Sequence, residues 1–130
     1  MNHTTMPSMK LLIATYLFTS ISVLNTAAQK SVVIDSVSAY IGQNVTVCSK
    51  VYGTHVTNGE KPVTYLNLGA AYPDQKLTVV IFQKDRPNFP PSPEDYYRLK
   101  EVCVTGMLKL YKDKPEMILS DKSMISVTEH

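Results

Sequence analysis

Aromatic and basic side chains gather in two stretches of the chain, residues 55–72 and residues 111–114. A tyrosine ring can stack on a nucleic-acid base or a sugar ring, and lysines beside it can contact phosphates. The residues that could bind a ligand in this way are His55, Lys61, Tyr65, Tyr72, Tyr111, Lys112 and Lys114. Their types and spacing predict a binding surface rather than a catalytic centre.

Each of these residues also has an ordinary structural interpretation. Tyr65 can be a core aromatic residue, because the phase of its strand is ambiguous, and Asn67 can bond to backbone at a bend. Lys112 and Lys114 flank a turn, where lysines are usually only solvated. His55 lies in a hairpin connection and is most simply a surface histidine. Both interpretations stay open on the sequence alone.

Catalytic and metal-binding chemistry has no matching constellation in the sequence. The two arginines, Arg86 and Arg98, fall in a loop and a helix, and Asp121 is an isolated acid. The histidines stand at positions 3, 55 and 130, which is no metal-ligand spacing. The sequence contains neither a serine elbow nor a glycine-rich phosphate loop. We therefore expect a protein that is not an enzyme and that binds neither a metal nor a cofactor.

Residues 1–28 have the pattern of an export signal. Lys10 supplies the positive charge, residues 11–24 the apolar stretch and residues 26–28 the small side chains of a cleavage site. The apolar stretch is shorter than the roughly 20 residues that a membrane span needs. We expect cleavage near Ala28, no membrane segment afterwards, and a periplasmic or secreted protein. Retention of an uncleaved membrane anchor is the alternative.

The expected mature chain, residues 29–130, has the length of one domain with one modest core. Loss of Lys10 leaves 12 Lys and Arg residues against 11 Asp and Glu residues, a net charge of +1. Non-specific affinity for nucleic acid comes from neutralised phosphates. A net charge near zero therefore argues against a protein that coats nucleic acid by bulk electrostatics.

Five strand-like runs follow one another in this domain. They are expected at residues 44–56, 63–68, 76–82, 101–111 and 116–119, with a further edge strand at residues 124–127. The almost continuous apolar third run predicts a strand buried on both faces. The Asn58-Gly59 pair is typical of a tight turn, as are residues 112–115. Gly106, within the fourth run, indicates a bend or bulge that turns a barrel corner.

A helix signal lies between the third and fourth runs, after a proline-rich loop at residues 86–93. Ser92 can cap the helix, Pro93 suits its first position, and the acids that follow favour the positive helix N-terminus. We expect this helix at residues 93–99. Five strands with one helix in this position predict a mainly β fold, a five-stranded OB-fold barrel.

A second short helix is expected at the N-terminal side of the barrel, at residues 35–42. Asp35 or Ser36 can cap it, and Gly42 can end it in the left-handed conformation. Its expected role is to cover one end of the barrel.

The two cysteines fall in the first and fourth runs. Cys48 and Cys103 are each out of phase with the neighbouring valines, so each thiol should point to the face opposite those valines. The first and fourth strands of an OB barrel are neighbours, which would let the sulfurs meet, and a bridge persists in an exported protein. We favour a disulfide between them; two unpaired, half-buried cysteines are the alternative.

Four segments carry a resemblance to a known family. They are IGQNVTVC at residues 41–48, YLNLG at 65–69, LTVVIF at 77–82 and VCVTG at 102–106. This series resembles small bacterial OB-fold domains described as nucleic-acid-binding-like, some of which are found beside staphylococcal-type nuclease domains. The resemblance covers about residues 32–127, and LNLG followed by tyrosine-proline is its most specific part. It implies nucleic-acid binding and brings no catalytic residue.

The sequence thus predicts an exported, non-catalytic OB-fold domain at residues 29–130. OB folds bind ligands across the second and third strands, between the loop joining strands one and two and the loop joining strands four and five. The candidate residues fall on those strands and loops. The predicted ligand is single-stranded nucleic acid. The alternative is a cell-envelope module that binds a protein or an oligosaccharide on the same face.

Overall fold

The computed structural model describes residues 17, 19, 20, 22 and 29–128. The expected export signal at residues 1–28 falls almost entirely outside the described residues. Among the described residues, no helix combines the length and the apolar character that crossing a bilayer requires.

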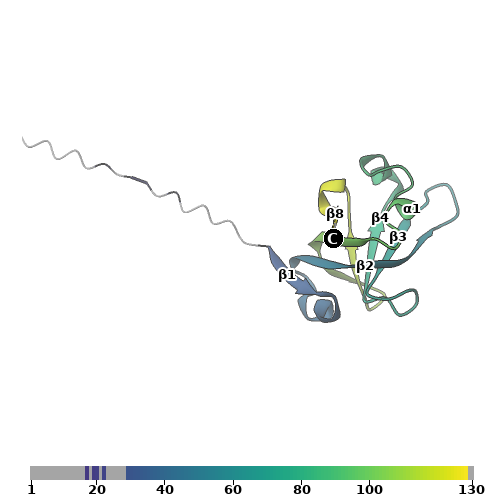
Figure 1. The fold of residues 1–130 in the computed structure, drawn as a ribbon, viewed down its shortest axis with the longest axis horizontal. Coiled ribbons are helices and arrows are strands. Elements are labelled where there is room, and N and C mark those ends of the chain that lie inside the picture. Colours follow the sequence, from purple (N-terminus) through teal and green to yellow (C-terminus); the bar gives the residue numbers. More distant parts are fainter. Residues whose placement is uncertain (1–16, 18, 21, 23–28, 129–130) are drawn as a thin grey trace, which may run out of the picture.

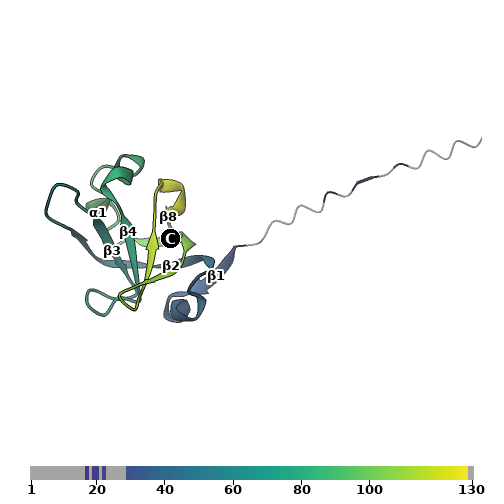
Figure 2. The ribbon, with the colours of Figure 1, turned by 180° about the vertical axis from the view of Figure 1, so that it is seen from behind.

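Residues 29–128 form a single mixed β-sheet around one hydrophobic core (Figures 1 and 2). The strands are β1 (Lys30–Val33), β2 (Asn44–Val56), β3 (Thr64–Leu68), β4 (Leu77–Ile81), β5 (Glu101–Met107), β6 (Lys109–Tyr111), β7 (Lys114–Ile118) and β8 (Ile125–Val127). Their order across the sheet is β6-β7-β4-β3-β2-β5-β8, and β1 pairs with β2 outside this path. The β1–β2 and β4–β7 pairs are parallel, and the others are antiparallel.

Strand β2 is 13 residues long and takes part in both halves of the sheet. Its first part, from Asn44 to Lys50, pairs with β5. From Val51 onward it pairs with β3, and this second pairing contains a β-bulge between Val51 and Gly53. The strand therefore changes partner along its length, and the sheet curls around the core (Figure 1). The prediction of a mainly β fold is confirmed.

The predicted closed barrel of five strands is wrong. In residues 29–128 the sheet has eight strands, and its end strands, β6 and β8, do not pair with each other. The run at residues 101–111 is divided at Leu108 into β5, which pairs with β2 and β8, and β6, which pairs with β7. A Cβ added to Gly106 would lie 3.1 Å from Cγ of Met117. The Met117 side chain of β7 thus packs against β5 at Gly106.

The predicted strand positions agree closely with the structure. β2 has the predicted bounds, β3 and β4 lie within the predicted runs, and β7 begins two residues before its run. The edge strand expected at residues 124–127 is β8, preceded by a short helix, and it pairs with β5. β1 was not predicted, because four residues with no clear alternation carry too little signal.

Four short helices connect the strands: η1 (Ile34–Tyr40), η2 (Gln83–Asn88), α1 (Pro93–Tyr96) and η3 (Lys122–Met124). η1 is the expected N-terminal helix, as a 3₁₀ helix, and Gly42 follows it with a φ of 86°. It continues directly from β1, with Val33 at its N-cap, so neither Asp35 nor Ser36 caps it. Figures 1 and 2 show β1 and η1 at one end of the domain and α1 at the other.

Helix α1 lies between β4 and β5, the position predicted for the helix between the third and fourth runs. It ends at Tyr96 rather than at residue 99, and the predicted side-chain cap is absent. Ser92 has a φ of 50°, and its carbonyl oxygen accepts the N–H groups of Asp95 and Tyr96, both at 2.9 Å. The Ser92 backbone, instead of its hydroxyl, therefore contacts the first turn. The preceding loop is partly helical, because η2 occupies residues 83–88.

Core and surface side chains alternate along most strands. The fully enclosed side chains include Val45, Val47, Val51, Leu66, Leu68, Leu77, Val79, Ile81, Val102, Val104, Leu108, Met117 and Leu119. β4 is buried on both faces, as predicted, since Val79 and Val80 point to opposite sides and both are buried. Phe82 is different: it directly follows β4 and is 38% exposed.

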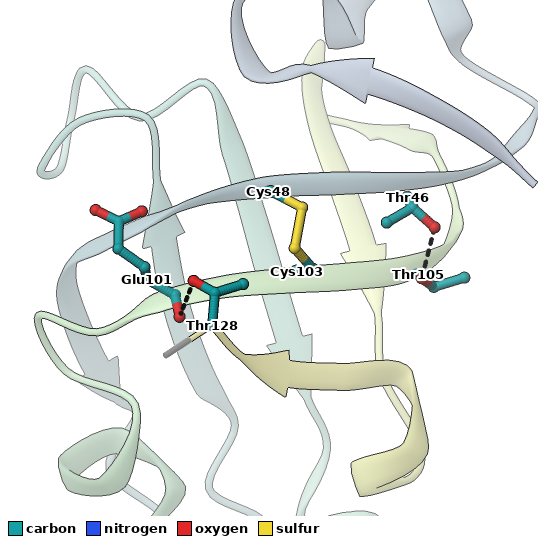
Figure 3. The surroundings of a disulfide bond; sticks show 6 residues. All are labelled: Thr46, Cys48, Glu101, Cys103, Thr105 and Thr128. Carbon is teal, nitrogen blue, oxygen red and sulfur yellow. Dashed lines mark hydrogen bonds between the residues drawn. A yellow bond between two sulfur atoms is a disulfide. The ribbon is translucent and has the colours of Figure 1, made fainter. Parts of the chain in front are cut away.

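Cys48 and Cys103 form the predicted disulfide (Figure 3). They are directly opposite each other in the β2–β5 ladder, with Cα atoms 4.0 Å apart. The bridge lies on the sheet face away from the core, as the phase of the valines predicts. Next to it the hydroxyl oxygens of Thr46 and Thr105 are 2.7 Å apart (Figure 3). The disulfide therefore clamps the two strands across their outer side.

Removal of the disulfide should destabilise the fold strongly. The bridge closes a loop with a sequence separation of 55 residues, for which the chain-entropy estimate is about 4 kcal/mol. We expect the Cys48→Ala/Cys103→Ala variant to lose about that much free energy of unfolding, measured by urea denaturation. Wild-type protein under a strong reductant should unfold like the variant. Equal midpoints for the oxidised wild type and the variant would contradict this role.

A side chain at Gly69 should lower the free energy of unfolding for two reasons, which can be measured separately. Its φ is 87°, and an added Cβ would lie 2.6 Å from Cγ of Lys76 and 2.9 Å from Cγ1 of Ile34. Gly42 has a similar φ of 86° but open space around it. The left-handed conformation alone costs an alanine about 1–2 kcal/mol. Gly42→Ala should therefore cost about that much free energy of unfolding, and Gly69→Ala clearly more. Equal losses would contradict the close packing at Gly69.

Candidate ligand-binding face

The polar side chains of β3, β4, β7 and β6 point away from the core and form a surface that we call the outer face. Leu66, Val79 and Met117 are aligned in register and point inward, so the residues between them point outward. The outer face consists of Tyr65, Asn67, Thr78, Val80, Glu116, Ile118, Lys109 and Tyr111, extended by His55 at the end of β2. This surface is the second-and-third-strand face predicted to bind ligand.

His55 and Tyr65 form a stacked aromatic pair at one side of the outer face, and we call this pair the platform. They are opposite each other in the β2–β3 ladder. Their ring centroids are 6.4 Å apart, and the ring planes differ by only 7°. His55 is exposed and Tyr65 is half-buried. Such a pair offers an aromatic ring on which a base or a sugar ring can stack.

Glu116 lies near the centre of the outer face. It is aligned with Thr78 on β4 and with Lys109 on β6. Its residue exposure is only 7%, and its Oε1 is 3.6 Å from Nζ of Lys109. Burial raises the pKa of the Tyr65 phenol, and the charges of Glu116 and Tyr111 raise it further. Glu116 and Tyr111 therefore both lie within electrostatic reach of Tyr65.

The turn between β6 and β7 forms one rim of the outer face. Lys112 and Asp113 have φ values of 49° and 62°, as a tight hairpin turn requires. Nζ of Lys112 lies 5.4 Å from the ring centroid of Tyr111. Nζ of Lys114 donates a hydrogen bond of 3.3 Å to the carbonyl oxygen of Pro73, in the β3–β4 loop. That bond ties the two loops together and brings the neighbouring Tyr72, which is 75% exposed, to the same rim.

A hollow of about 390 Å³ lies at the opposite end of the sheet. It is lined by Lys61, Val63, Phe82, Gln83 and Lys84. Phe82 follows β4 in extended conformation, so the alternation of β4 turns its ring to the same side as Val80. The hollow therefore continues the outer face beyond the ends of β3 and β4. It combines one aromatic ring with two lysines.

Arg86 fixes the segment that carries part of this hollow. Its Nη1 donates to Oε2 of Glu94 at 2.9 Å and also to Oγ1 of Thr64. η2, α1 and β3 are thereby joined through one guanidinium group. The Arg86 hydrogen bond lowers the pKa of Glu94, although partial burial opposes the shift. Lys84 and Gln83 belong to η2, so this ion pair positions two residues that line the hollow.

The structure thus brings most of the predicted site residues to one surface. His55, Tyr65 and Tyr111 lie on the outer face, Tyr72, Lys112 and Lys114 lie at its rim, and Lys61 lines the hollow. The surface also includes residues that were not predicted as site residues, among them Phe82, Lys84, Lys109 and Glu116. The alternation of Glu116 with the apolar Met117 was a signal for its outward position. Among the described residues, no three His, Cys, Asp or Glu side chains come together as a metal site requires.

Comparisons with known proteins give the chain no family. No family model matches it. No curated protein matches it either. Among solved structures it is similar to a crystal structure of a protein described as an aspartyl-tRNA synthetase from Leishmania major Friedlin, with a TM-score of 0.48 and 12% sequence identity. The match covers 82% of this chain and only 22% of that one.

The Arg86–Glu94 pair contributes to the free energy of unfolding, and this contribution decreases at acidic pH. A carboxyl group whose pKa is lowered by folding stabilises the folded state above its ordinary pKa of 4.5, and this contribution is lost as the pH falls through the lowered value. Glu94→Gln should therefore reduce the free energy of unfolding at pH 7 and flatten its decline below pH 4.5.

Asp95→Asn is the matched control for this measurement. Asp95 is exposed on the same helix, and its Oδ1 lies 3.9 Å from Arg98, so an exposed pair of this kind contributes little. Denaturation curves from pH 7 to pH 3 compare the two variants with the wild type. An unchanged pH profile for Glu94→Gln would show that the pair does not stabilise the fold.

Proposed function

We propose that this chain is a non-catalytic, exported binding module whose outer face holds single-stranded nucleic acid. The observation that carries the proposal is the His55–Tyr65 platform, with lysines at both ends of the surface around it. Every nucleobase has a flat face, so such a platform accepts an unpaired strand without reading its sequence. A duplex keeps its bases stacked on one another and offers the platform nothing to stack on.

The distribution of lysines supports a strand that crosses the outer face. Lys61 and Lys84 line the hollow at one end, and Lys112 and Lys114 flank the turn at the other. Phe82 in the hollow provides a second stacking ring next to lysine side chains. The phosphates of a strand that is stacked on both rings would pass close to these lysines. Stacking contributes about 1–3 kcal/mol per base, so two rings suffice for modest affinity.

Two further observations support the exported location and the family proposal. A disulfide persists in oxidising compartments such as the periplasm, and the Cys48–Cys103 bridge therefore supports export. Strand β2 lies between β3 and β5, which is the neighbour relation expected for the first, second and fourth strands of an OB fold. We accordingly propose kinship with the small bacterial OB-fold domains described as nucleic-acid-binding-like.

A neutral oligosaccharide is the second candidate ligand, and Glu116 is the observation that favours it. A carboxylate on the same face as an aromatic pair can accept hydrogen bonds from sugar hydroxyl groups, and Asn67, in the same row as Glu116, can both donate and accept. The two candidates differ in their response to salt, because only the nucleic acid releases counterions on binding.

Oligonucleotide binding should depend on the Tyr65 ring. We expect Tyr65→Ala to weaken binding of a fluorescently labelled single-stranded 12-mer by about 1–3 kcal/mol, measured by anisotropy at low salt. Tyr65→Phe keeps the ring and should bind almost like the wild type. Tyr52→Ala is the matched control, because Tyr52 is an exposed tyrosine at the β2 bulge, outside the outer face.

Salt dependence then separates the two candidate ligands. Contacts from three or four lysines predict that log K falls with log salt with a slope of about −2 to −3. A Tyr65→Ala variant that binds like Tyr52→Ala would contradict the platform. Binding of an oligosaccharide with no salt dependence, without oligonucleotide binding, would replace nucleic acid by the second candidate.

A further inference from the structure

The hollow beyond the ends of β3 and β4 has a positively charged lining. Its side chains are those of Lys61, Val63, Phe82, Gln83 and Lys84, without any acidic residue. The neighbouring acids in the sequence, Glu60 and Asp85, do not line it. Lys61 and Lys84 are exposed, and within residues 29–128 neither forms an ion pair. Both charges are therefore available to an anionic ligand.

The two lysines come from different segments that one guanidinium group holds together. Lys61 precedes β3, and Lys84 belongs to η2. Nη1 of Arg86, also in η2, donates to Oγ1 of Thr64, the first residue of β3, and to Oε2 of Glu94 at 2.9 Å. Nη2 of Arg86 donates to Oε1 of Glu94 at 3.4 Å. Both oxygens of Glu94 are thus occupied by Arg86, and the segments that carry the two lysines are fixed to each other.

Phe82 places the hollow next to the platform. Tyr65 is aligned with Val80, and Phe82 lies two residues further along the chain in extended conformation. Residues in this diagonal relation on one sheet face have Cα atoms about 7–8 Å apart, within reach of aromatic side chains. The chain enters η2 directly after Phe82, so the face formed by β3 and β4 ends at this ring. A strand that stacks on Tyr65 and then on Phe82 therefore reaches the hollow with its last nucleotide.

The end of a nucleic-acid strand differs chemically from its interior. An internal phosphodiester carries one negative charge, whereas a terminal phosphomonoester carries about −1.5 to −2 at pH 7 and has three acceptor oxygens. Two ammonium groups in a lining without an acid match the charge of the monoester better than that of the diester. The hollow, at about 390 Å³, lies near the lower limit of the roughly 300–1,000 Å³ of small-molecule sites. Its size therefore suits one nucleotide.

We infer that the hollow binds the phosphorylated end of the strand, with the last base stacked on Phe82 and the terminal phosphate in contact with Lys61 and Lys84. This inference rests on the proposed function, because it names the kind of strand end that the same surface prefers. The platform and the lysines at the rim bind the interior of the strand. The hollow adds a preference for a strand that ends in a phosphomonoester.

The test compares three single-stranded oligo(dT) hexamers that carry an internal fluorescent label. One has hydroxyl groups at both ends, one has a 5′-phosphate and one has a 3′-phosphate. Binding is measured by fluorescence anisotropy at pH 7.5 and low salt. Hydrogen bonds from lysines to a charged acceptor predict that at least one phosphorylated strand binds about tenfold more tightly than the unphosphorylated strand. Equal affinity of the wild type for all three strands would overturn the inference.

The Lys61→Gln/Lys84→Gln variant removes both charges of the hollow. Both positions are exposed, so the core stays intact, and the ratio between phosphorylated and unphosphorylated strands should fall to about one. Lys112→Gln/Lys114→Gln is the matched control, because it removes the same charge from exposed positions at the opposite rim. It should weaken binding of all three strands and leave their ratio unchanged.

Two outcomes of the variant measurements would overturn the role of the hollow. One is a tenfold ratio that persists in Lys61→Gln/Lys84→Gln, and the other is an equal loss of the ratio in both double variants. Either result would assign the preference to general charge attraction. Absence of binding of all three strands by the wild type would overturn the proposed function itself, and the inference with it.

Discussion

The β-bulge in β2 decides which side chains in the last part of this strand point away from the core. Val51 is opposite the inward-pointing Leu68, and Gly53 is opposite the outward-pointing Asn67, so Tyr52 is the extra residue. An inserted residue reverses the alternation of every residue after it. Before the bulge the odd-numbered Val45 and Val47 point to the core. After it the odd-numbered His55 points outward. Without the bulge the same strand would place His55 on the core side of the sheet.

The bulge also separates the part of β2 that secures the fold from the part that carries the candidate site. The first part is held against β5 by a continuous ladder, by the Cys48–Cys103 bridge and by the Thr46–Thr105 contact. The last part presents His55 beside Tyr65. The disulfide and the Thr46–Thr105 contact therefore stabilise one half of the sheet, and the aromatic rings of His55 and Tyr65 lie on the other half. A ligand on the outer face would contact a surface that is supported from the neighbouring half.

Strand positions were predictable because each depends on a local pattern. The valines before and after Cys48 set both the bounds of β2 and the side of the sheet that the sulfur occupies, and both predictions are confirmed. Barrel closure was not predictable in this way. It depends on which strands share hydrogen bonds across a gap, and the two end strands of the sheet, β6 and β8, do not pair.

The candidate site shows the same division between local and non-local information. Tyr65 was recognisable as a ring on the second strand, and Lys112 and Lys114 as residues of a turn. Phe82 was hidden, because the uniformly apolar run at residues 77–82 does not show which side chain becomes exposed. The position of Glu116 near the centre of the outer face could not be predicted. It results from the alignment of Glu116 with Thr78 and Lys109, which depends on the pairing of β7 with β4 and β6. The sequence shows which side-chain types are present, whereas the strand pairing decides which of them share one surface.

On the proposed function, the ligand contacts the outer face and not the disulfide-bearing half of the sheet. The most direct measurement is a ¹H–¹⁵N NMR titration of the oxidised protein with a single-stranded oligonucleotide at low salt. We expect shift changes only in the outer-face strands, the two loops at the rim of that face and the hollow, with the signals of Cys48, Cys103 and their neighbours unchanged. Shift changes centred on the β2–β5 ladder around the disulfide would contradict this expectation.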